Sequence, residues 1–115
     1  MRGMATRDGK PAMCFGVMGE HYQPMGQTWV LTNAFEYRMD IQAAIDSPSV
    51  CPYMGEVEVE QGVSPALREK LSALGHKLEE VARPLGGGQA IMIDHERGVL
   101  IGGSDPRKDG VALGY

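Results

Sequence analysis

A run of apolar residues near the N-terminus places the strongest constraint on the fold. Residues 12–18 read AMCFGVM and contain no charged or amide side chain. They follow Asp8-Gly9, a dipeptide typical of hairpin turns, and Pro11, which is tolerated at the first residue of a strand. A strand that is apolar along its whole length is expected to be covered on both faces. The run therefore predicts a strand inside a layered fold.

Two helices are predicted after this strand. The first runs from about Met25 to Tyr37, with Pro24 near its start, where the missing N–H of proline costs nothing. Asp40 is typical of the N-cap residue of a second, shorter helix. This second helix ends near Pro48, because the residue before a proline avoids helical geometry.

The second half of the chain contains further strand patterns. EVEVE, residues 56–60, alternates strictly, so its two valines are expected to face a core and its three glutamates to face water. HKLEEVA, residues 76–82, predicts a short strand, and residues 90–94 and 99–103 predict a β-hairpin around HERG. GGGQ, residues 86–89, lacks the Lys-Ser/Thr of a phosphate-binding loop and is interpreted as a flexible lead-in to the hairpin.

A third helix is predicted between these strands. Ser64-Pro65 is typical of a helix start, with serine as the N-cap and proline at the first helical position. Gly75 is suited to the end of the helix. The apolar stripe of this helix consists of Leu67, Leu71 and Leu74. The resulting order is strand, helix, short helix, strand, helix, strand and hairpin, which predicts an α+β fold.

Composition bounds the class of protein. The chain has 115 residues, of which 43% are hydrophobic and 23% charged, so we expect residues 1–115 to form a single globular domain. The formal net charge of −4 and the scattered basic residues argue against nucleic-acid binding. No apolar run approaches the roughly 20 residues that a membrane helix needs. The polar N-terminus does not resemble a secretory signal, which favours a cytoplasmic location.

The histidines and cysteines of the sequence give little indication of a metal site or of a nucleophilic thiol. His21, His76 and His95 are far apart and no CxxC motif is present, so we expect neither a metal nor an organic cofactor. Cys14 and Cys51 are interpreted as reduced thiols, while a disulfide between them stays open. Cys14 lies in an apolar strand, where a reactive thiolate is disfavoured.

Three separate motifs resemble the C-terminal part of the gamma-glutamyltransferase family. They are FGVMGEHYQPMGQ (15–27), AFEYRMDIQAAIDSP (34–48) and GGGQAIMIDHERGVLIGGSDPRKDGVALGY (86–115). The motifs occur in the family's order, and the resemblance covers about residues 8–115. It implies part of the αββα sandwich of the N-terminal nucleophile hydrolases, with an antiparallel sheet that carries helices on one face. It also implies that the last residues pack against the sandwich.

The resemblance implies a chemistry as well. In the family a precursor cleaves itself, and the hydroxyl of the new N-terminal threonine attacks a γ-glutamyl amide such as that of glutathione. The acyl group then passes to water or to an amino acid. That threonine lies upstream of the matched motifs, whereas Thr6, Thr28 and Thr32 are internal. The resemblance therefore implies a C-terminal fragment without its upstream catalytic segment, which has no catalytic residue of its own and is inactive alone.

Gly19 and Glu20 are the candidate substrate-binding residues that the resemblance implies. The family has two consecutive glycines here, whose backbone N–H groups face the developing oxyanion. Gly19 matches the first glycine and Glu20 stands in place of the second. A backbone N–H remains, but a carboxylate now lies beside a site for negative charge, and a positive φ is costly for glutamate. A base and orienter pair of His21 and Glu20 is an alternative, although a loop-exposed histidine is favoured.

Two functions follow as the main alternatives, and whether the chain is an enzyme stays open. The first is a self-associating structural domain, because the loss of upstream strands leaves a sheet edge and apolar surface, with residues 12–18 as the exposed segment. The second is the C-terminal subunit of a γ-glutamyl hydrolase or transferase, active only with its missing N-terminal partner segment. A small ligand-binding module around Gly19 and Glu20 is a third possibility. Ser49 stands where the family commonly has arginine, and no role is carried to it.

Overall fold

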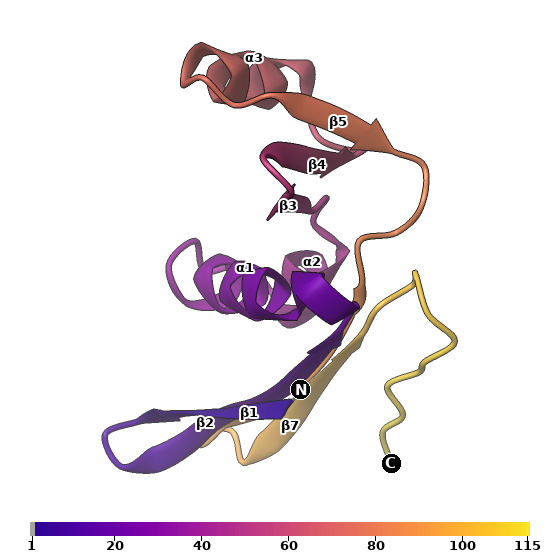
Figure 1. Cartoon of the computed structure of the whole chain (residues 1–115). Coiled ribbons are helices and arrows are strands. Elements are labelled where there is room, and N and C mark those ends of the chain that lie inside the picture. The colour runs from indigo at the N-terminus through magenta and orange to yellow at the C-terminus, as the bar shows by residue number, and fades with distance from the viewer. Residues whose placement is uncertain (1) are drawn as a thin grey trace. The chain divides into compact units, whose positions relative to one another are not determined.

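The computed structural model describes residues 2–115, which fall into two compact units. The first unit consists of Met1–Ser47 and Gly86–Tyr115, and the second consists of Pro48–Leu85. Each unit contains its own sheet, and the elements of both are labelled in Figure 1. The expectation that residues 1–115 form a single domain stays a prediction.

The first unit is built on a four-stranded antiparallel sheet with the order β1-β2-β6-β7. Its strands are β1 (Arg2–Arg7), β2 (Lys10–Met18), β6 (Gly87–Asp94) and β7 (Val99–Ser104). Asp8 and Gly9 both have positive φ, 53° and 75°, as a type I′ hairpin turn requires. The turn predicted from Asp8-Gly9 thus joins β1 to β2, and the predicted β6–β7 hairpin is also present.

The predicted strand at residues 12–18 lies inside the sheet as part of β2. It pairs with β1 on one side and β6 on the other, so the expectation that it forms an exposed sheet edge is wrong. β1 covers that edge, and its sequence RGMATR begins and ends with a charge, which is common for an edge strand but gives little strand signal. Burial also alternates along β2, since Met13 is fully buried whereas Met18 is 51% exposed.

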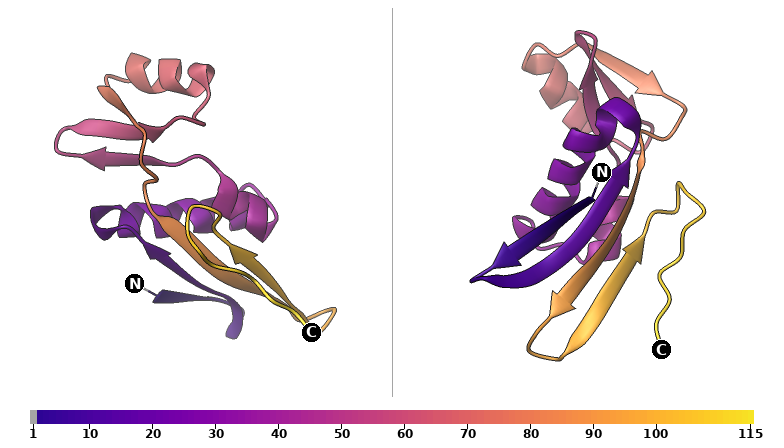
Figure 2. Two further views of the ribbon diagram at one scale, coloured as in Figure 1. Left: turned by 90° about the vertical axis from the view of Figure 1, so that its right-hand side faces the viewer. Right: turned by 60° about the horizontal axis from the view of Figure 1, so that its bottom comes forward.

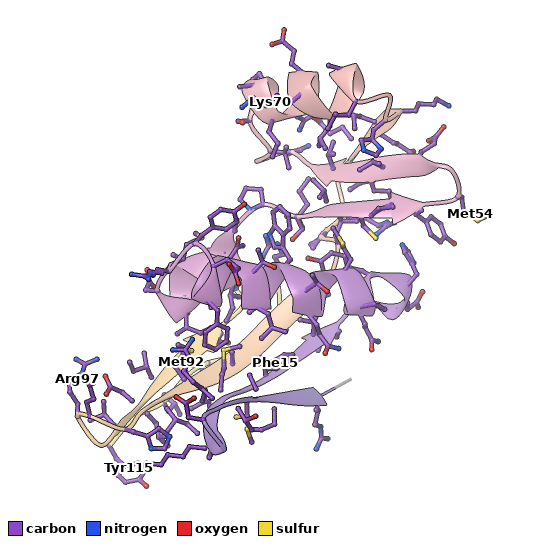
Figure 3. The ribbon with its side chains drawn as sticks, turned by 90° about the vertical axis from the view of Figure 1, so that its left-hand side faces the viewer. Phe15, Met54, Lys70, Met92, Arg97 and Tyr115 are labelled. Carbon is purple, nitrogen blue, oxygen red and sulfur yellow. The ribbon has the colours of Figure 1, made fainter. Side chains whose placement is uncertain are left out.

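Two helices, α1 (Gln23–Phe35) and α2 (Ile41–Asp46), cover one face of this sheet (Figure 2). The Asp40 side chain caps α2 as predicted and accepts a hydrogen bond from the Ala43 N–H at 3.0 Å. A β carbon at Gly103 of β7 would lie 2.9 Å from Ile45, so glycine lets α2 approach the strand closely. Figure 3 shows the side chains between α1 and the sheet. The predicted antiparallel sheet with helices on one face is confirmed for this unit.

The C-terminal tail after β7 runs back beside the same strand (Figure 2). Successive strand residues point to opposite faces, so Gly102 and Ser104 face away from α2. A β carbon at Gly102 would lie 3.0 Å from Ala112 of the tail. A β carbon at Gly110 would lie 2.5 Å from the Gln89 amide nitrogen and 2.6 Å from the Ser104 hydroxyl. The tail therefore packs on the sheet face opposite the helices.

The second unit is a three-stranded sheet with the order β3-β4-β5 and one helix. Its elements are β3 (Val50–Tyr53), β4 (Glu56–Glu60), α3 (Pro65–Ala73) and β5 (Leu78–Val81). β3 and β4 are antiparallel, whereas α3 connects β4 to a parallel β5. The Ser64 hydroxyl caps α3 by accepting a hydrogen bond from the Leu67 N–H at 3.2 Å, as predicted. β3 has only four residues and contains Pro52, so its sequence gave no strand signal.

The predicted EVEVE strand is present as β4, but two of its glutamates do not face water. Glu58 is 6% exposed and Glu60 is 9% exposed. The Glu60 carboxylate accepts hydrogen bonds from the backbone N–H of Ser49 at 2.8 Å and of Leu85 at 3.0 Å, while Glu58 lies 2.7 Å from Arg83. Carboxylates can be buried when they are paired in this way. Alternation separates the two faces of a strand, but it does not show that one face is open to water.

The leucine stripe of α3 does not face a core. No residue of α3 is buried, Leu67 is 37% exposed and Leu74 is 77% exposed. Helical spacing shows that the leucines share a face, but it does not identify what covers that face. None of the helices within residues 2–115 has the length and apolar character needed to cross a membrane.

Candidate functional site

The loop that follows β2 carries both residues predicted to bind substrate. Gly19 has a φ of 135° and Glu20 has a φ of 49°. A left-handed backbone places the β carbon of glutamate close to its own carbonyl oxygen, which costs roughly 1–2 kcal/mol. The loop therefore keeps the conformation that favours glycine, although residue 20 is a glutamate.

A single turn of 3₁₀ helix, η1 (Glu20–Tyr22), begins in this loop. The Tyr22 N–H donates a hydrogen bond to the Gly19 carbonyl at 2.8 Å. No side chain caps the start of η1, and the first amides of a helical turn have no partner inside that turn. Within residues 2–115, no side-chain cap therefore occupies the start of η1, where the resemblance places the backbone amides that face an oxyanion.

Tyr22 holds the loop against the sheet. Its side chain is 5% exposed, and a β carbon at Gly26 of α1 would lie 2.5 Å from the ring. A β carbon at Gly86 would overlap the same ring and the carbonyl oxygen of Met18, and Gly86 has a φ of 145°. The GGGQ segment leads into β6 as predicted, but its three glycines are buried and closely packed. The sequence interpretation treated these glycines as flexible and missed their close packing. The run of three glycines was the only sequence signal of that packing.

The Glu20 side chain is exposed and introduces a negative charge into the loop. Within residues 2–115, its carboxylate has no hydrogen-bond or ion-pair partner. His21 is also exposed, as predicted for a loop histidine. Two negative charges about 4 Å apart repel by about 1 kcal/mol even in water, so the Glu20 carboxylate would oppose the formation of an oxyanion at the neighbouring amides.

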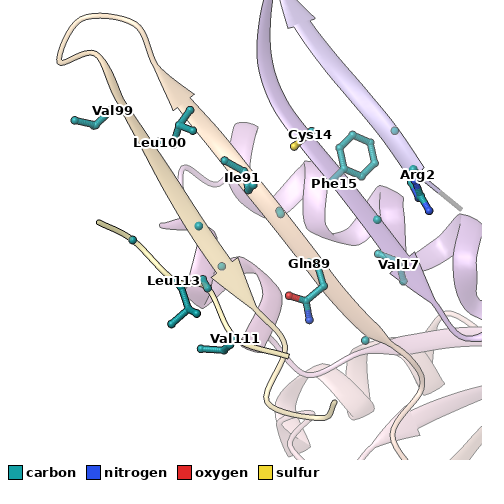
Figure 4. Close-up of a pocket in the computed structure, with 18 of the residues that line it drawn as sticks. Arg2, Cys14, Phe15, Val17, Gln89, Ile91, Val99, Leu100, Val111 and Leu113 are labelled. Atoms are coloured by element: carbon teal, nitrogen blue, oxygen red, sulfur yellow. The ribbon is translucent and has the colours of Figure 1, made fainter. Parts of the chain in front are cut away.

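A groove of about 1140 Å³ adjoins this loop on the sheet face that the helices leave open (Figure 4). Met18 and Gly87 line its end nearest the loop. The apolar part of the lining includes Ile91, Leu100, Val111 and Leu113. Gln89 and Arg2 contribute polar groups. The groove thus combines an apolar floor with a few hydrogen-bonding side chains.

Asp105 and Arg107 form a buried clasp that sequence reasoning did not find. The Asp105 carboxylate is 3% exposed and accepts hydrogen bonds from the Gly88 N–H at 2.7 Å and from Arg107. The Arg107 guanidinium also donates to the carbonyl groups of Ile45 at 3.1 Å and Ser47 at 3.0 Å. The clasp ties the end of α2 to the glycine run that supports Tyr22.

The other residues considered from the sequence lie outside this loop. Cys14 is half-buried in β2 and lines the groove, while Cys51 is buried in the second unit, and both are free thiols. Burial and the nearby Glu58 carboxylate raise the pKa of the Cys51 thiol above its usual value. Thr28 lies in α1, where its hydroxyl donates to the Pro24 carbonyl at 3.0 Å. In the described part of the chain, no cluster of three or more His, Cys, Asp or Glu side chains is placed to hold a metal ion.

One known protein family matches the sequence that forms this loop and sheet. The family described as gamma-glutamyltranspeptidase matches residues 2–115, which is nearly the whole chain. The chain belongs to the gamma-glutamyltranspeptidase family. The resemblance drawn from the three sequence motifs is thereby confirmed.

Individual members of the family support this assignment. The chain is 36% identical over 123 residues to the glutathione hydrolase-like YwrD proenzyme of Bacillus subtilis, covering 99% of this chain but 23% of that protein. It is similar to the structure of cephalosporin acylase from Bacillus halodurans, with a TM-score of 0.91, 34% identity and coverage of 99% of this chain and 22% of the acylase. The 115-residue chain therefore spans about a quarter of the length of these two relatives.

The fold itself is shared with more distant members. The gamma-glutamyltranspeptidase of Pseudomonas nitroreducens matches all of this chain and 61% of its own chain, with a TM-score of 0.86 and 22% identity. The predicted α+β fold, as part of an N-terminal nucleophile hydrolase sandwich, is confirmed by these neighbours.

Proposed function

We propose that this chain supplies the oxyanion loop of an amide-cleaving enzyme and is inactive until it combines with a segment that carries the threonine nucleophile. The observation that carries the proposal is the left-handed backbone retained at Gly19 and Glu20. The relatives named as a glutathione hydrolase-like proenzyme and a cephalosporin acylase support a reaction at an amide bond. Glutathione and other γ-glutamyl amides are the substrates we expect.

In the proposed reaction, the threonine hydroxyl of the partner segment forms a bond to the carbonyl carbon of the amide. The carbonyl π electrons move onto the oxygen, and the backbone N–H groups of Gly19 and Glu20 donate hydrogen bonds to that oxyanion. The α-amine of the threonine takes the hydroxyl proton as the new bond forms. Collapse of this intermediate breaks the C–N bond, and the same amine returns the proton to the leaving nitrogen, which departs as an amine. Water or the amine of an amino acid then takes the acyl group from the threonine.

A chimera tests this function. This chain replaces the part of the Bacillus subtilis YwrD proenzyme that it matches, and hydrolysis of γ-glutamyl-p-nitroanilide is followed by release of p-nitroaniline. We expect the 115-residue chain to be inactive and the chimera to be active. A matched chimera whose nucleophilic threonine is replaced by alanine provides the background rate. Turnover by the isolated chain, or no turnover above background by the chimera, contradicts the proposal.

Self-association is a second candidate function, supported by the apolar residues on the open face of the first sheet. Met4 is 58% exposed, Met18 is 51% exposed and Leu100 is 69% exposed. Burial of such a face in a symmetric dimer would remove this apolar surface from water. We expect light scattering behind a sizing column to give the mass of a dimer.

A pair of charge substitutions locates the interface of that dimer. Leu100→Asp is expected to convert the dimer to a monomer, because it places a charge on the proposed contact face. Leu74→Asp, at the C-cap of α3, is the control, since Leu74 is 77% exposed in the second unit. A monomeric unsubstituted chain, or equal masses for both variants, contradicts self-association through this face.

A further inference from the structure

The chain passes between its two units at two junctions, the Ser47-Pro48 and Leu85-Gly86 peptide bonds. A rotation of one unit relative to the other must be absorbed by changes of φ and ψ in a few residues at such junctions. Hydrogen bonds and packing on either side of a junction decide which residues are free to change. The contacts of each unit next to the two junctions are therefore examined in turn.

Glu60 fixes the side of both junctions that belongs to the second unit. Its carboxylate accepts hydrogen bonds from the N–H of Ser49 at 2.8 Å and from the N–H of Leu85 at 3.0 Å. The Glu60 N–H also donates to the Ser49 carbonyl at 3.1 Å. A β carbon at Gly62 would lie 2.8 Å from the Cγ of Pro48, so the proline ring packs on the same unit. The rigid part of the second unit therefore extends to Pro48 and Leu85.

Asp105 and Arg107 fix the side of both junctions that belongs to the first unit. The Arg107 guanidinium donates to the Ser47 carbonyl at 3.0 Å and lies 3.1 Å from the Asp105 carboxylate. That carboxylate accepts a hydrogen bond from the Gly88 N–H at 2.7 Å. A single buried ion pair thus holds the chain where it leaves the first unit and where it returns to it.

The two junctions differ in stiffness. The ring of Pro48 fixes its own φ, and the residue before a proline is confined to extended geometry, as Ser47 is with a φ of −53° and a ψ of 132°. Gly86 has a φ of 145°, and glycine populates positive and negative φ about equally readily. The Ser47-Pro48 junction is therefore the stiffer of the two, and Gly86 is the residue best able to absorb a change of backbone angle.

A change of backbone angle at Gly86 reaches the loop that follows β2. A β carbon at Gly86 would overlap the Tyr22 ring and the Met18 carbonyl oxygen, so movement of this residue displaces one of these groups. Tyr22 is joined to the loop by its N–H, which donates to the Gly19 carbonyl at 2.8 Å.

We infer that the second unit rotates as a rigid body about the Ser47-Pro48 pivot, with Gly86 as the hinge residue. The rotation moves Tyr22 and, through it, the loop at Gly19. The second unit is thus a conformational device that changes the geometry of this loop without contributing a group to it. The inference concerns the motion of the chain itself, so its test does not depend on catalysis by the loop.

Residual dipolar couplings of the isotope-labelled 115-residue chain test the hinge. Because the units rotate relative to one another, we expect the N–H couplings of the two units to require alignment tensors of different magnitude. Pro48→Gly frees the pivot, so it is expected to widen that difference and to shift the Tyr22 amide resonance. Pro52→Gly, in β3, is the matched control and is expected to do neither.

The outcomes of this experiment separate the parts of the inference. A single tensor that fits the whole unsubstituted chain overturns the hinge, even where a variant unfolds. A difference that Pro48→Gly does not widen overturns the pivot. A wider difference without a shift at Tyr22 overturns the coupling to the loop.

Glu60→Gln tests whether the buried carboxylate confines the rotation to the junctions. The NH₂ group of glutamine would face one of the two N–H donors, so one donor loses its acceptor. We expect hydrogen exchange at the Ser49 or Leu85 amide to become about tenfold faster. Glu56→Gln, at the other end of β4 and paired with the exposed Lys77 side chain, is expected to change neither rate. Equal exchange rates in both variants would show that Glu60 does not limit the hinge.

Discussion

Replacement of Asp105 by alanine is expected to lower the free energy of unfolding of the first unit by about 3–5 kcal/mol, as for other buried ion pairs that lose one partner. The Asp105 carboxylate is 3% exposed and accepts hydrogen bonds from the Gly88 N–H and from Arg107. Its removal leaves a buried amide without an acceptor and a largely buried guanidinium without its counter-charge. Urea unfolding of the 115-residue chain measures the loss.

Asp94→Ala is the matched control for this substitution. Asp94 also pairs with an arginine close in sequence, Arg97, at 2.7 Å, but the pair lies at the exposed tip of the β6–β7 hairpin. Hydrogen bonds from Arg97 lower the pKa of Asp94 below its usual value. Solvent screens such a pair, so we expect only a small loss of stability. Equal losses for the two variants would contradict a special role for the buried clasp.

A double substitution separates the lost hydrogen bonds from the unpaired charge. Asp105→Ala with Arg107→Ala removes both charges together, so we expect less destabilisation than the sum of the two single variants. Hydrogen exchange at the Gly88 amide provides a local readout, since this N–H loses its acceptor in both variants that lack Asp105. An additive result would indicate that the two side chains act independently.

The sequence was sufficient to predict helix caps and helix ends, because each of these depends on residues only a few positions apart. Asp40 and Ser64 cap the helices that follow them, and Gly75 ends α3 with a φ of 94°. Each of these effects spans three or four residues, so it can be recognised without knowledge of the fold. β1 and β3 were missed because their sequences lack alternation, and only their pairing with β2 and β4 makes them strands.

The candidate site combines a part that could be predicted with a part that could not. Gly19 and Glu20 were identified through the family motif. The clasp could not be found in this way, because Asp-Pro is ordinary turn chemistry and the Arg107 contact with Ile45 spans 62 residues. The packing of the Lys108 side chain on Gly87 likewise joins residues that are distant in sequence. Contacts of this kind cannot be predicted until the pairing and register of the strands are known.

Replacement of Glu20 by glycine is expected to raise kcat of the chimera for γ-glutamyl-p-nitroanilide by about tenfold, which corresponds to 1.4 kcal/mol of transition-state stabilisation. Removal of the carboxylate relieves its repulsion of the developing oxyanion. The same change relieves the left-handed backbone strain at a φ of 49°. These two causes predict the same direction of effect, so the glycine variant alone cannot separate them.

Glu20→Gln separates charge from strain, because it keeps the β carbon and the backbone strain but removes the negative charge. If repulsion by the carboxylate limits the reaction, the glutamine and glycine variants will have similar kcat values, while the glycine variant alone will change in stability. If backbone strain limits the reaction, Glu20→Gln will resemble the unsubstituted chimera. Glu36→Gln, at the C-terminal end of α1, controls for a general effect of net charge. Unchanged kcat in both Glu20 variants would show that residue 20 does not face the reacting carbonyl, and the oxyanion assignment of the loop would be wrong.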